Sequence, residues 1–353
     1  MDFDFSEDQR LFQESLRELL AVECPPGLVR SLWESETGRS PELWAKLAGV
    51  GLLGARAPEA LGGLGLSEVD LVLLLEETGR AALPEPAAET AAVAVPLLCE
   101  AGSEALSRDW LPRVAAGEAA LAVGFEEDPL VVHAGSADLL LLPSGDELHA
   151  VPPGAARCVR QPCSDPGRRL FRVTFRPGPA TRVARGPAAR RLLAAAFDRA
   201  VLAAAAQALG VAQQLVDLAV RYAGQRRQFG VPIGSFQAVK HPLASAQVGI
   251  EFARPVVYRA AWSLAQGAPH RSLDVSHAKL AAGEAATRAA RAALQCFGAI
   301  GYTWEQDLQI WLKRAWALDV AAGTGAFHRA RLAAVILDGE ASLGPGGLDA
   351  LRL

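Results

Sequence analysis

The chain has 353 residues, a formal net charge of −4, and a composition that is 51% hydrophobic but only 6% aromatic. This apolar content excludes an intrinsically disordered chain, and the length suffices for one large core or several smaller ones. No basic excess is present to neutralise phosphates, so we expect no nucleic acid partner. Much of the apolar content is alanine and leucine, both strong helix formers, which favours a mostly helical protein.

The sequence also indicates the cellular compartment of the protein. Apolar stretches such as Leu192 to Leu202 are interrupted by charges and fall short of the roughly 20 residues that span a bilayer, so we expect no membrane span. The five cysteines are scattered, as reduced structural thiols would be. The acidic N-terminus lacks the basic-then-apolar order of a signal peptide. These features predict a cytoplasmic protein.

Residues 1–118 predict an N-terminal α-helical domain. Ser6 and Gln9 have the spacing of a capping box, and Ser40 precedes a proline at a first helical position. The predicted helices run from about Glu7 to Val22, from Pro41 to Gly51, from Ser67 to about Gly79 and from Ser103 to Ala116.

Residues 119–185 change pattern and predict a shortened β domain. Short apolar or alternating runs bounded by turn residues predict strands at Leu139–Leu142, Leu148–Val151 and Leu170–Phe175. Frequent prolines between them indicate edges and loops, so the sheet should be small.

Residues 186–342 predict a C-terminal four-helix bundle, followed by a loose tail over 343–353. Short connections with Gly or Pro join long helical patterns, which is typical of an antiparallel bundle. A second capping box, Thr303 to Gln306, should begin the last helix. The predicted helices are Ala188 to Ala223, Ser235 to Ala265, Ser272 to Phe297 and Thr303 to Leu337.

A search for catalytic constellations finds none of the common motifs. The six histidines lie far apart, so we predict no metal site. Two polar, glycine-containing segments, Tyr222–Gly230 and Gln295–Thr303, lie where helices begin or end. Arginine and glutamine there suit an anion or nucleotide, although ordinary helix punctuation with solvated charges explains the same pattern.

These segments resemble those of the acyl-CoA dehydrogenase family of flavoproteins. The family carries a Y-x-x-x-R-x-x-F-G segment leading into F-Q, and a Q-x-x-G-G-x-G-Y segment before its last helix. Further matches occur in the family's order, at Phe5–Leu20, Leu43–Gly54, Glu59–Gly65 and Trp110–Glu118. The resemblance implies the family's architecture of helical domain, β domain and helical bundle.

The resemblance also implies FAD as cofactor, in a binding site shared across a subunit interface. The positions that match the family's FAD contacts are Arg226, Gln228, Phe229, Gln237, Gln295, Gly298 and Gly301. The implied partners are an acyl-CoA thioester, a homologous acyl-CoA dehydrogenase subunit or a second copy in a dimer or tetramer, and an electron-transfer flavoprotein or similar acceptor.

The implied reaction is the α,β-dehydrogenation of an acyl-CoA, in which a carboxylate removes the α-proton and a hydride passes to the flavin. The family keeps its glutamate base before Gly-Thr or on the first bundle helix. Here those positions are Ala322 and Ala200. Asp319 and Asp198 are the carboxylates nearest in sequence, although a salt bridge to Lys313 or Arg314 is the simpler role for Asp319.

The β domain departs from the family as well. Neither Trp nor Thr occurs between Ala119 and Arg172, where the family keeps groups that hold the flavin ring and the thioester. Three interpretations remain open. The chain is the base-lacking subunit of a heteromeric dehydrogenase, a dehydrogenase acting alone with a displaced base, or a flavin-free acyl-binding or scaffold protein on the same fold.

Overall fold

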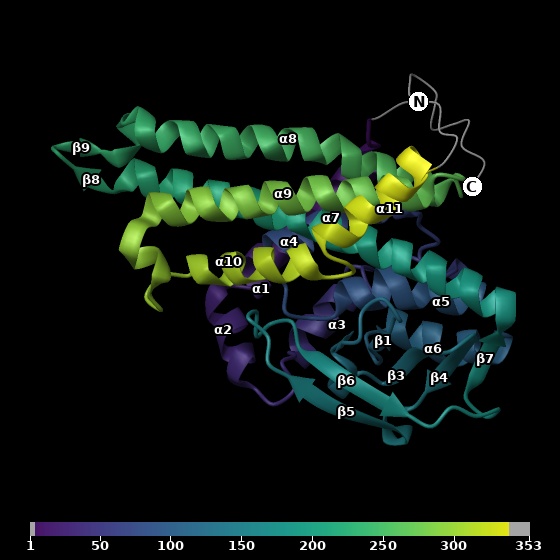
Figure 1. The fold of residues 1–353 in the computed structure, drawn as a ribbon. Helices are drawn as coiled ribbons and strands as arrows, with labels where there is room; N and C mark the ends of the chain where they lie inside the picture. Colours follow the sequence, from purple (N-terminus) through teal and green to yellow (C-terminus); the bar gives the residue numbers. More distant parts are fainter. Residues whose placement is uncertain (1–3, 339–353) are drawn as a thin grey trace. The chain divides into compact units, whose positions relative to one another are not determined.

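The structure is a computed structural model and describes residues 4–338. Its internal contacts divide the chain into two compact units (Figure 1). The first contains the chain up to Leu74 together with Leu83–Ala203, and the second contains Leu75–Ala82 together with the chain from Ala204. The architecture is mostly helical with a small β region, which confirms the predicted fold class.

The four helices predicted for the first unit begin within about one residue of their predicted starts, whereas α2 and α5 were not predicted. Ser6 and Gln9 form both hydrogen bonds of a capping box at the start of α1, and the hydroxyls of Ser40 and Ser103 cap α3 and α6. A π-helical segment at Ala88–Ala94 leads into α5. The α-helices are α1 (Glu7–Glu23), α2 (Pro26–Glu34), α3 (Pro41–Gly49), α4 (Glu68–Arg80, which continues into the second unit), α5 (Val95–Glu100) and α6 (Glu104–Ala115).

Two small sheets follow. One has the strand order β1-β3-β4-β7 and the other β2-β6-β5, and apolar residues from both, including Leu140 and Phe171, share one core cluster. The three predicted strands are present as β3 (Leu139–Ser144), β4 (Glu147–Val151) and β6 (Leu170–Phe175). Sequence patterns missed β1 (Leu121–Val123), β2 (Val131–Val132), β5 (Ala156–Gln161) and β7 (Arg182–Arg185), because these strands are short or mostly polar and depend on pairing partners.

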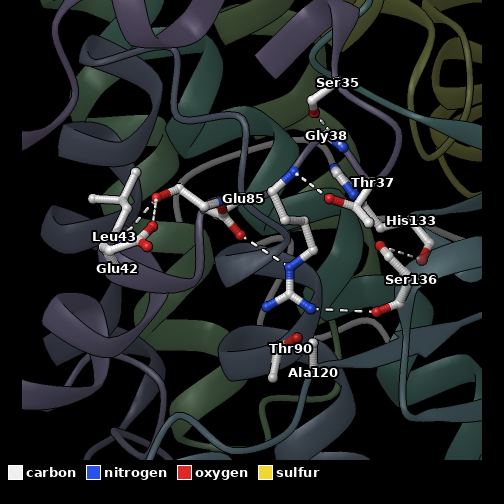
Figure 2. Close-up of polar contacts among 12 residues, drawn as sticks. Ser35, Thr37, Gly38, Glu42, Leu43, Glu85, Thr90, Ala120, His133 and Ser136 are labelled. Carbon is white, nitrogen blue, oxygen red and sulfur yellow. Dashed lines mark hydrogen bonds and ion pairs between the residues drawn. The ribbon is translucent and has the colours of Figure 1, made fainter. Parts of the chain in front are cut away.

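Arg39 ties the α2–α3 loop to Glu85, which follows α4, and to the β region within the first unit. The side chain of Glu85 is fully buried and accepts from Arg39 Nε at 3.1 Å and from the Ser40 amide at 2.5 Å. Arg39 also donates to the carbonyl of Ser136 at 3.2 Å, and Figure 2 shows Glu85 and Ser136 on either side of this guanidinium. Burial raises the pKa of Glu85, an effect that the Arg39 charge opposes.

The second unit is a helical bundle with a small hairpin (Figure 1). The helix α7 (Gly186–Gln225) runs from the first unit into the second. After it come the strands β8 (Arg227–Gln228) and β9 (Val231–Pro232) and the helices α8 (Gln237–Ala265), α9 (Arg271–Phe297), α10 (Leu308–Val320) and α11 (Gly325–Asp338).

The length of α7 corrects the expectation about apolar stretches. By length and composition alone, this 40-residue helix contains a window that could cross a membrane. Asp198 and Arg199, the charges that interrupt the apolar stretch, lie inside one continuous helix. However, 72% of the window is buried inside the protein, and core helices meet the same criteria. The window is therefore weak evidence for a span.

The predicted last helix is wrong in two respects. It starts at Leu308 rather than at Thr303, whose hydroxyl donates to the carbonyl of Ile300 instead of capping a helix. It is also broken, because the chain turns between Val320 and Gly325 with a positive φ at Ala322 and Gly323. Helix-forming alanines lie on both sides of this break, so the sequence pattern alone predicts one continuous helix. The domain boundaries stay predictions, and the tail at 343–353 lies outside the described residues.

Candidate functional site

The first candidate segment forms a hairpin at the end of α7. The strand β8 pairs with β9, and the turn between them holds Phe229 at φ +54° and Gly230 at φ +84°. Two successive left-handed residues match the twist of a tight hairpin, and glycine adopts that conformation without strain. The ring of Phe229 is 91% exposed and lies edge-on to Phe236 at 6.1 Å. The hairpin thus presents Arg226, Gln228 and Phe229 at the surface.

The second candidate segment ends α9 beside the same end of α7 (Figure 1). The rings of Tyr222 and Phe297 stack at 4.2 Å, and the thiol of Cys296 lies 3.6 Å from the carbonyl oxygen of Ala219. Gly298 terminates α9 at φ +66°, and Gly301 is buried in the turn that follows. The tertiary structure therefore brings the two predicted segments together at one end of the bundle.

The side chains there suit an external anionic ligand. Arg226, Gln228, Gln237 and Gln295 are exposed, and none of these side chains hydrogen bonds to another residue within 4–338. A guanidinium supplies charge and paired donors for phosphate oxygens, and three amides supply donors and acceptors for a ribose or a base. This donor set fits a dinucleotide such as FAD, held from one side by residues of this chain.

Ala322, one of the two positions that the resemblance assigns to the family's glutamate base, lies in the α10–α11 turn. Ala322 has φ +52° and Gly323 φ +100°, and a Cβ on Gly323 would lie 2.6 Å from the Phe327 ring, so only glycine fits there. The fully buried His328 faces the turn. Its Nε2 lies 2.9 Å from the carbonyl oxygen of Ala322, and its Nδ1 lies 3.2 Å from the hydroxyl of Ser276.

Sequence reasoning did not single out His328, because a lone histidine six residues after Ala322 carries no recognisable pattern. The pKa of this imidazole is about 4, chiefly because burial lowers it. The bond to Ala322 opposes this shift, and the charges of Lys279 and Arg331 add to it. The imidazole is therefore neutral near pH 7. It holds a backbone turn in which position 322 carries a methyl group and no base.

Asp319 lies about one turn before Ala322 but makes no ion pair with Lys313 or Arg314 among the described residues. Lys313 instead donates to Gln309 and lies over the Trp304 ring. The carboxylate of Asp319 packs against α9, where its Oδ1 lies 2.8 Å from the position of a Cβ on Gly283. It lines a cavity of about 500 Å³ between α9 and α11.

Asp198 and Ala200 lie in the first unit, on the N-terminal half of α7. Asp198 is 3% exposed, and the neighbouring Arg199 pairs with Glu68 at 2.9 Å and also with Glu100. The adjacent Phe197 ring packs edge-on against Phe125 at 5.4 Å. A buried carboxylate in this packed neighbourhood is a poor candidate for a base that must reach a substrate.

The candidate cofactor segments and the base position lie at different levels of the second unit. Asp319 contacts α9 at Gly283, whereas Gln295 lies about 18 Å further along the same helix at 1.5 Å per residue. Figure 1 shows the β8–β9 hairpin at one end of the bundle and α11 toward the other. The structure therefore brings the cofactor residues together but separates them from Ala322.

Comparisons with known proteins bear on this arrangement. The family model for the acyl-CoA dehydrogenase N-terminal domain matches residues 6–118, and the model for the C-terminal domain matches residues 190–337. The acyl-CoA dehydrogenase IpdE2 of Mycolicibacterium smegmatis is 33% identical over 311 residues, which cover 88% of this chain and 93% of that protein.

Solved structures show the same fold. A variant of the Tcur3481-Tcur3483 steroid ACAD has a TM-score of 0.84 at 27% identity and covers 94% of this chain and 98% of its own. The ChsE4-ChsE5 complex from Mycobacterium tuberculosis has a TM-score of 0.85 at 24% identity, with 97% and 100% covered. These matches confirm the resemblance, and the chain belongs to the acyl-CoA dehydrogenase family of flavoprotein oxidoreductases.

Proposed function

We propose that this chain is the base-lacking subunit of a heteromeric acyl-CoA dehydrogenase. The observation that carries the proposal is Ala322, a residue with no acid-base group at the family's base position, in a turn that His328 holds in place. A homologous partner would supply the glutamate and the contacts to the flavin ring. The expected substrate is an acyl-CoA thioester, the expected acceptor an electron-transfer flavoprotein or similar protein, and the expected compartment the cytoplasm.

The exposure of the residues predicted to hold FAD supports a cofactor site shared between this chain and a partner subunit. Arg226, Gln228, Gln237 and Gln295, with the backbone at Gly298 and Gly301, would hold the phosphate and adenosine portions of FAD. Phe229, with 91% of its surface exposed, would pack beside the cofactor once a partner covers the hairpin. FAD, when bound, accepts the hydride from the substrate β-carbon. Two of the similar structures are named as two-protein assemblies, which supports a heteromer over a single active chain.

The neighbourhoods of the two nearby carboxylates argue against a displaced base. Asp198 is buried in the first unit, and Asp319, although it lines the cavity between α9 and α11, lies three residues before Ala322. A base misplaced by about 1 Å can lose about two orders of magnitude in rate. If this chain nevertheless acts alone, Asp319→Asn should abolish its turnover.

The test is to purify the chain alone and after co-expression with a homologous dehydrogenase that retains Glu-Gly-Thr, and to record visible spectra and acyl-CoA oxidation. We expect flavin and activity only in the co-purified complex. Arg226→Gln should remove the flavin, whereas Arg221→Gln, an exposed arginine of α7, should not. Replacing the partner's glutamate should abolish turnover, and Ala322→Gln should leave it unchanged.

Two outcomes would contradict the proposal. Stoichiometric flavin in the chain alone, bleached by acyl-CoA, would establish a stand-alone enzyme. No flavin in any co-purified complex, with binding of acyl-CoA retained, would favour an acyl-binding or scaffold protein.

A further inference from the structure

Arginine is concentrated in the part of the chain that builds the β region. Residues 152–191 contain ten arginines and one aspartate, with no lysine or glutamate, although the whole chain has a net charge of −4. Three of these arginines pair with acidic side chains, and one donates to backbone carbonyls of α2; they are Arg168, Arg182, Arg190 and Arg169. Like charges that stay unpaired repel one another, so an acidic partner would relieve this excess.

The exposed face of β5 and β6 carries two of the other arginines. Alternate residues of both strands pack against the core cluster, so the residues between them point outward. The outward residues are exposed and are Arg157, Val159, Arg172 and Thr174. In the register of the sheet Arg157 lies opposite Thr174. Arg172 lies opposite Val159, so the two arginines are diagonal neighbours, about 7–8 Å apart.

Neither of these guanidinium groups has a partner within residues 4–338. No hydrogen bond or ion pair joins the side chain of Arg157 or Arg172 to another residue there. Arg160 and Arg176, near the ends of the two strands, are exposed and also lack such partners in that range. The apolar Val159 beside them is 42% exposed. Arginines interspersed with apolar groups are typical of surfaces that bind another protein.

The strand β5 also forms an edge of its sheet. The order β2-β6-β5 leaves β5 paired with β6, and no strand among the described residues pairs with its other side (Figure 1). Its other backbone hydrogen bonds are local, from the Ala156 amide to the Pro153 carbonyl and from the Gln161 side chain to the carbonyls of Val159 and Arg160. An extended polypeptide can pair along such an edge, whereas a lipid headgroup or a nucleic acid cannot.

A cavity at the end of β5 continues the positive surface. Its volume is about 410 Å³, and it is lined by Arg160 and Gln161 of β5 and by the loop that follows. The charged residues of this lining are Arg160, Arg168 and Arg169, and no carboxylate is among them. An acidic side chain beyond the end of a docked strand would therefore meet favourable charge there.

We propose that the free edge and the exposed face of β5, with Arg157 and Arg172, bind an extended acidic segment of another protein. The backbone of the segment would pair with β5, and its carboxylates would accept paired N–H bonds from the guanidinium groups. Carboxylates at alternate positions of a strand lie about 7 Å apart, which matches the spacing of the two arginines.

The charge of the whole chain favours a protein over a membrane or a nucleic acid. A net charge of −4 provides no long-range attraction to an anionic surface, whereas a docked segment reaches the arginines at contact distance. Arginines beside the edge also repel the same edge of a second copy. The surface lies in the first unit and uses none of the residues predicted to hold FAD, so the inference does not depend on the proposed function.

The first test measures binding of a labelled peptide of alternating Glu and Val to the purified full-length chain by fluorescence anisotropy at low salt. We expect saturable binding that weakens as salt is added. The double variant Arg157→Gln, Arg172→Gln should weaken it at least about tenfold, equivalent to about 1.4 kcal/mol. The conservative pair Arg157→Lys, Arg172→Lys should be intermediate, because lysine keeps the charge but not the paired donors.

The second test separates backbone pairing from charge. A peptide of alternating Glu and Pro keeps the carboxylates but lacks every second backbone donor, so we expect it to bind at least about tenfold more weakly. Backbone amides of 156–161 should exchange hydrogen more slowly when the Glu-Val peptide is bound. Equal affinity for the two peptides, with unchanged exchange, would overturn the pairing with β5.

The matched control is the double variant Arg191→Gln, Arg221→Gln, which changes the net charge equally at exposed arginines of α7. It should not alter binding. A peptide of alternating Lys and Val should not bind to the parent chain, a control that does not depend on the folding of any variant. Circular dichroism will establish that each variant is folded. No saturable binding of the Glu-Val peptide, or equal weakening by the control pair, would overturn the proposal.

Other occupants of the surface are tested in the same way. Tighter binding of phosphatidylserine vesicles or of a DNA duplex, lost in Arg157→Gln, Arg172→Gln, would assign the surface to that class and overturn its assignment to a protein segment. Self-association of the parent chain in sedimentation velocity, lost in the same variant, would assign it to a second copy with the same consequence. Flavin recovery on co-expression is a separate measurement, so failure here leaves the heteromer proposal standing.

Discussion

The Nε2 atom of His328 lies 2.9 Å from the carbonyl oxygen of Ala322, so the first turn of α11 holds the α10–α11 turn directly. The bond uses the Nε2 proton, and Nδ1 faces the hydroxyl of Ser276. Both ring nitrogens of this buried imidazole are therefore engaged. The histidine fixes the backbone at the position that the resemblance assigns to the family's base.

The strain at Ala322 predicts a stabilising substitution. A non-glycine residue in the left-handed region costs about 1 kcal/mol or more, whereas glycine adopts it freely. We therefore expect Ala322→Gly to raise the free energy of unfolding by about 0.5–1 kcal/mol. Ala330→Gly, at an exposed position inside α11, should lower it by about 1 kcal/mol. Urea unfolding measures both, and two changes of the same sign would contradict the argument.

The pKa of His328 predicts how stability varies with pH. The value is about 4 in the folded protein, below the ordinary 6.5. Below pH 6.5 this histidine is therefore protonated in the unfolded chain but stays neutral in the folded protein. The free energy of unfolding consequently falls as the pH drops toward 4. This contribution amounts to about 3 kcal/mol.

We expect His328→Gln to destabilise the protein by about 2 kcal/mol at pH 7 and to flatten its pH dependence between 6.5 and 4. Thermal unfolding at several pH values measures both effects. His241→Gln, at an exposed position of α8, is the control and should retain the parent slope. If stability depends on pH in the same way in His328→Gln as in the parent, groups other than His328 determine this dependence.

The guanidinium of Arg169 caps the C-terminus of α2. It donates to the carbonyls of Leu32 at 2.8 Å, Ser35 at 2.5 Å and Glu36 at 2.9 Å, and the residue is 2% exposed. Arg169→Lys should therefore destabilise the first unit by about 3 kcal/mol, because lysine cannot reach all three acceptors and buried carbonyls lose their donors.

The control for this variant is Arg172→Lys, at an exposed position of β6, which should change stability by less than about 0.5 kcal/mol. Gly38 gives a second test, because a Cβ added there would lie 1.9 Å from Arg169 Nε and the φ of this residue is +73°. Gly38→Ala should destabilise as strongly as Arg169→Lys. A small effect of either variant would show that the guanidinium is not needed there.

Two glycines allow α4 and α7 to cross in close contact within the second unit. A Cβ on Gly210 would lie 1.8 Å from the carbonyl oxygen of Glu76, and one on Gly79 would lie 2.1 Å from that of Gln207. Both obstacles are backbone atoms, which cannot move aside without separating the helices. We expect Gly210→Ala to cost about 3 kcal/mol or more in thermal unfolding. Gly224→Ala, where a Cβ meets nothing within 4 Å, should be close to neutral.

Local patterns determined the mostly helical architecture, the capped helix starts and the family of this protein. Ser6, Ser40 and Ser103 cap helices because a side-chain oxygen reaches backbone amides two or three residues away, an interaction local in sequence. The order of short motifs was likewise enough to identify the family, whereas the assignment of Ala322 and Ala200 to the positions of its base stays a prediction. The sequence predicted the pairing of strands less well, because a strand such as β5 is recognisable only by its hydrogen bonds to a neighbouring strand.

Only the tertiary structure decided the break between α10 and α11 and its attachment to His328. Alanine-rich sequence is compatible with a continuous helix. What ends it is a pair of left-handed residues, held by His328 of α11, which also contacts Ser276 of α9. The cavity beside this break depends on the same packing, since its charged residues come from α9, α10 and α11. Side chains so far apart along the chain share a cavity only after these helices pack, which no local pattern encodes.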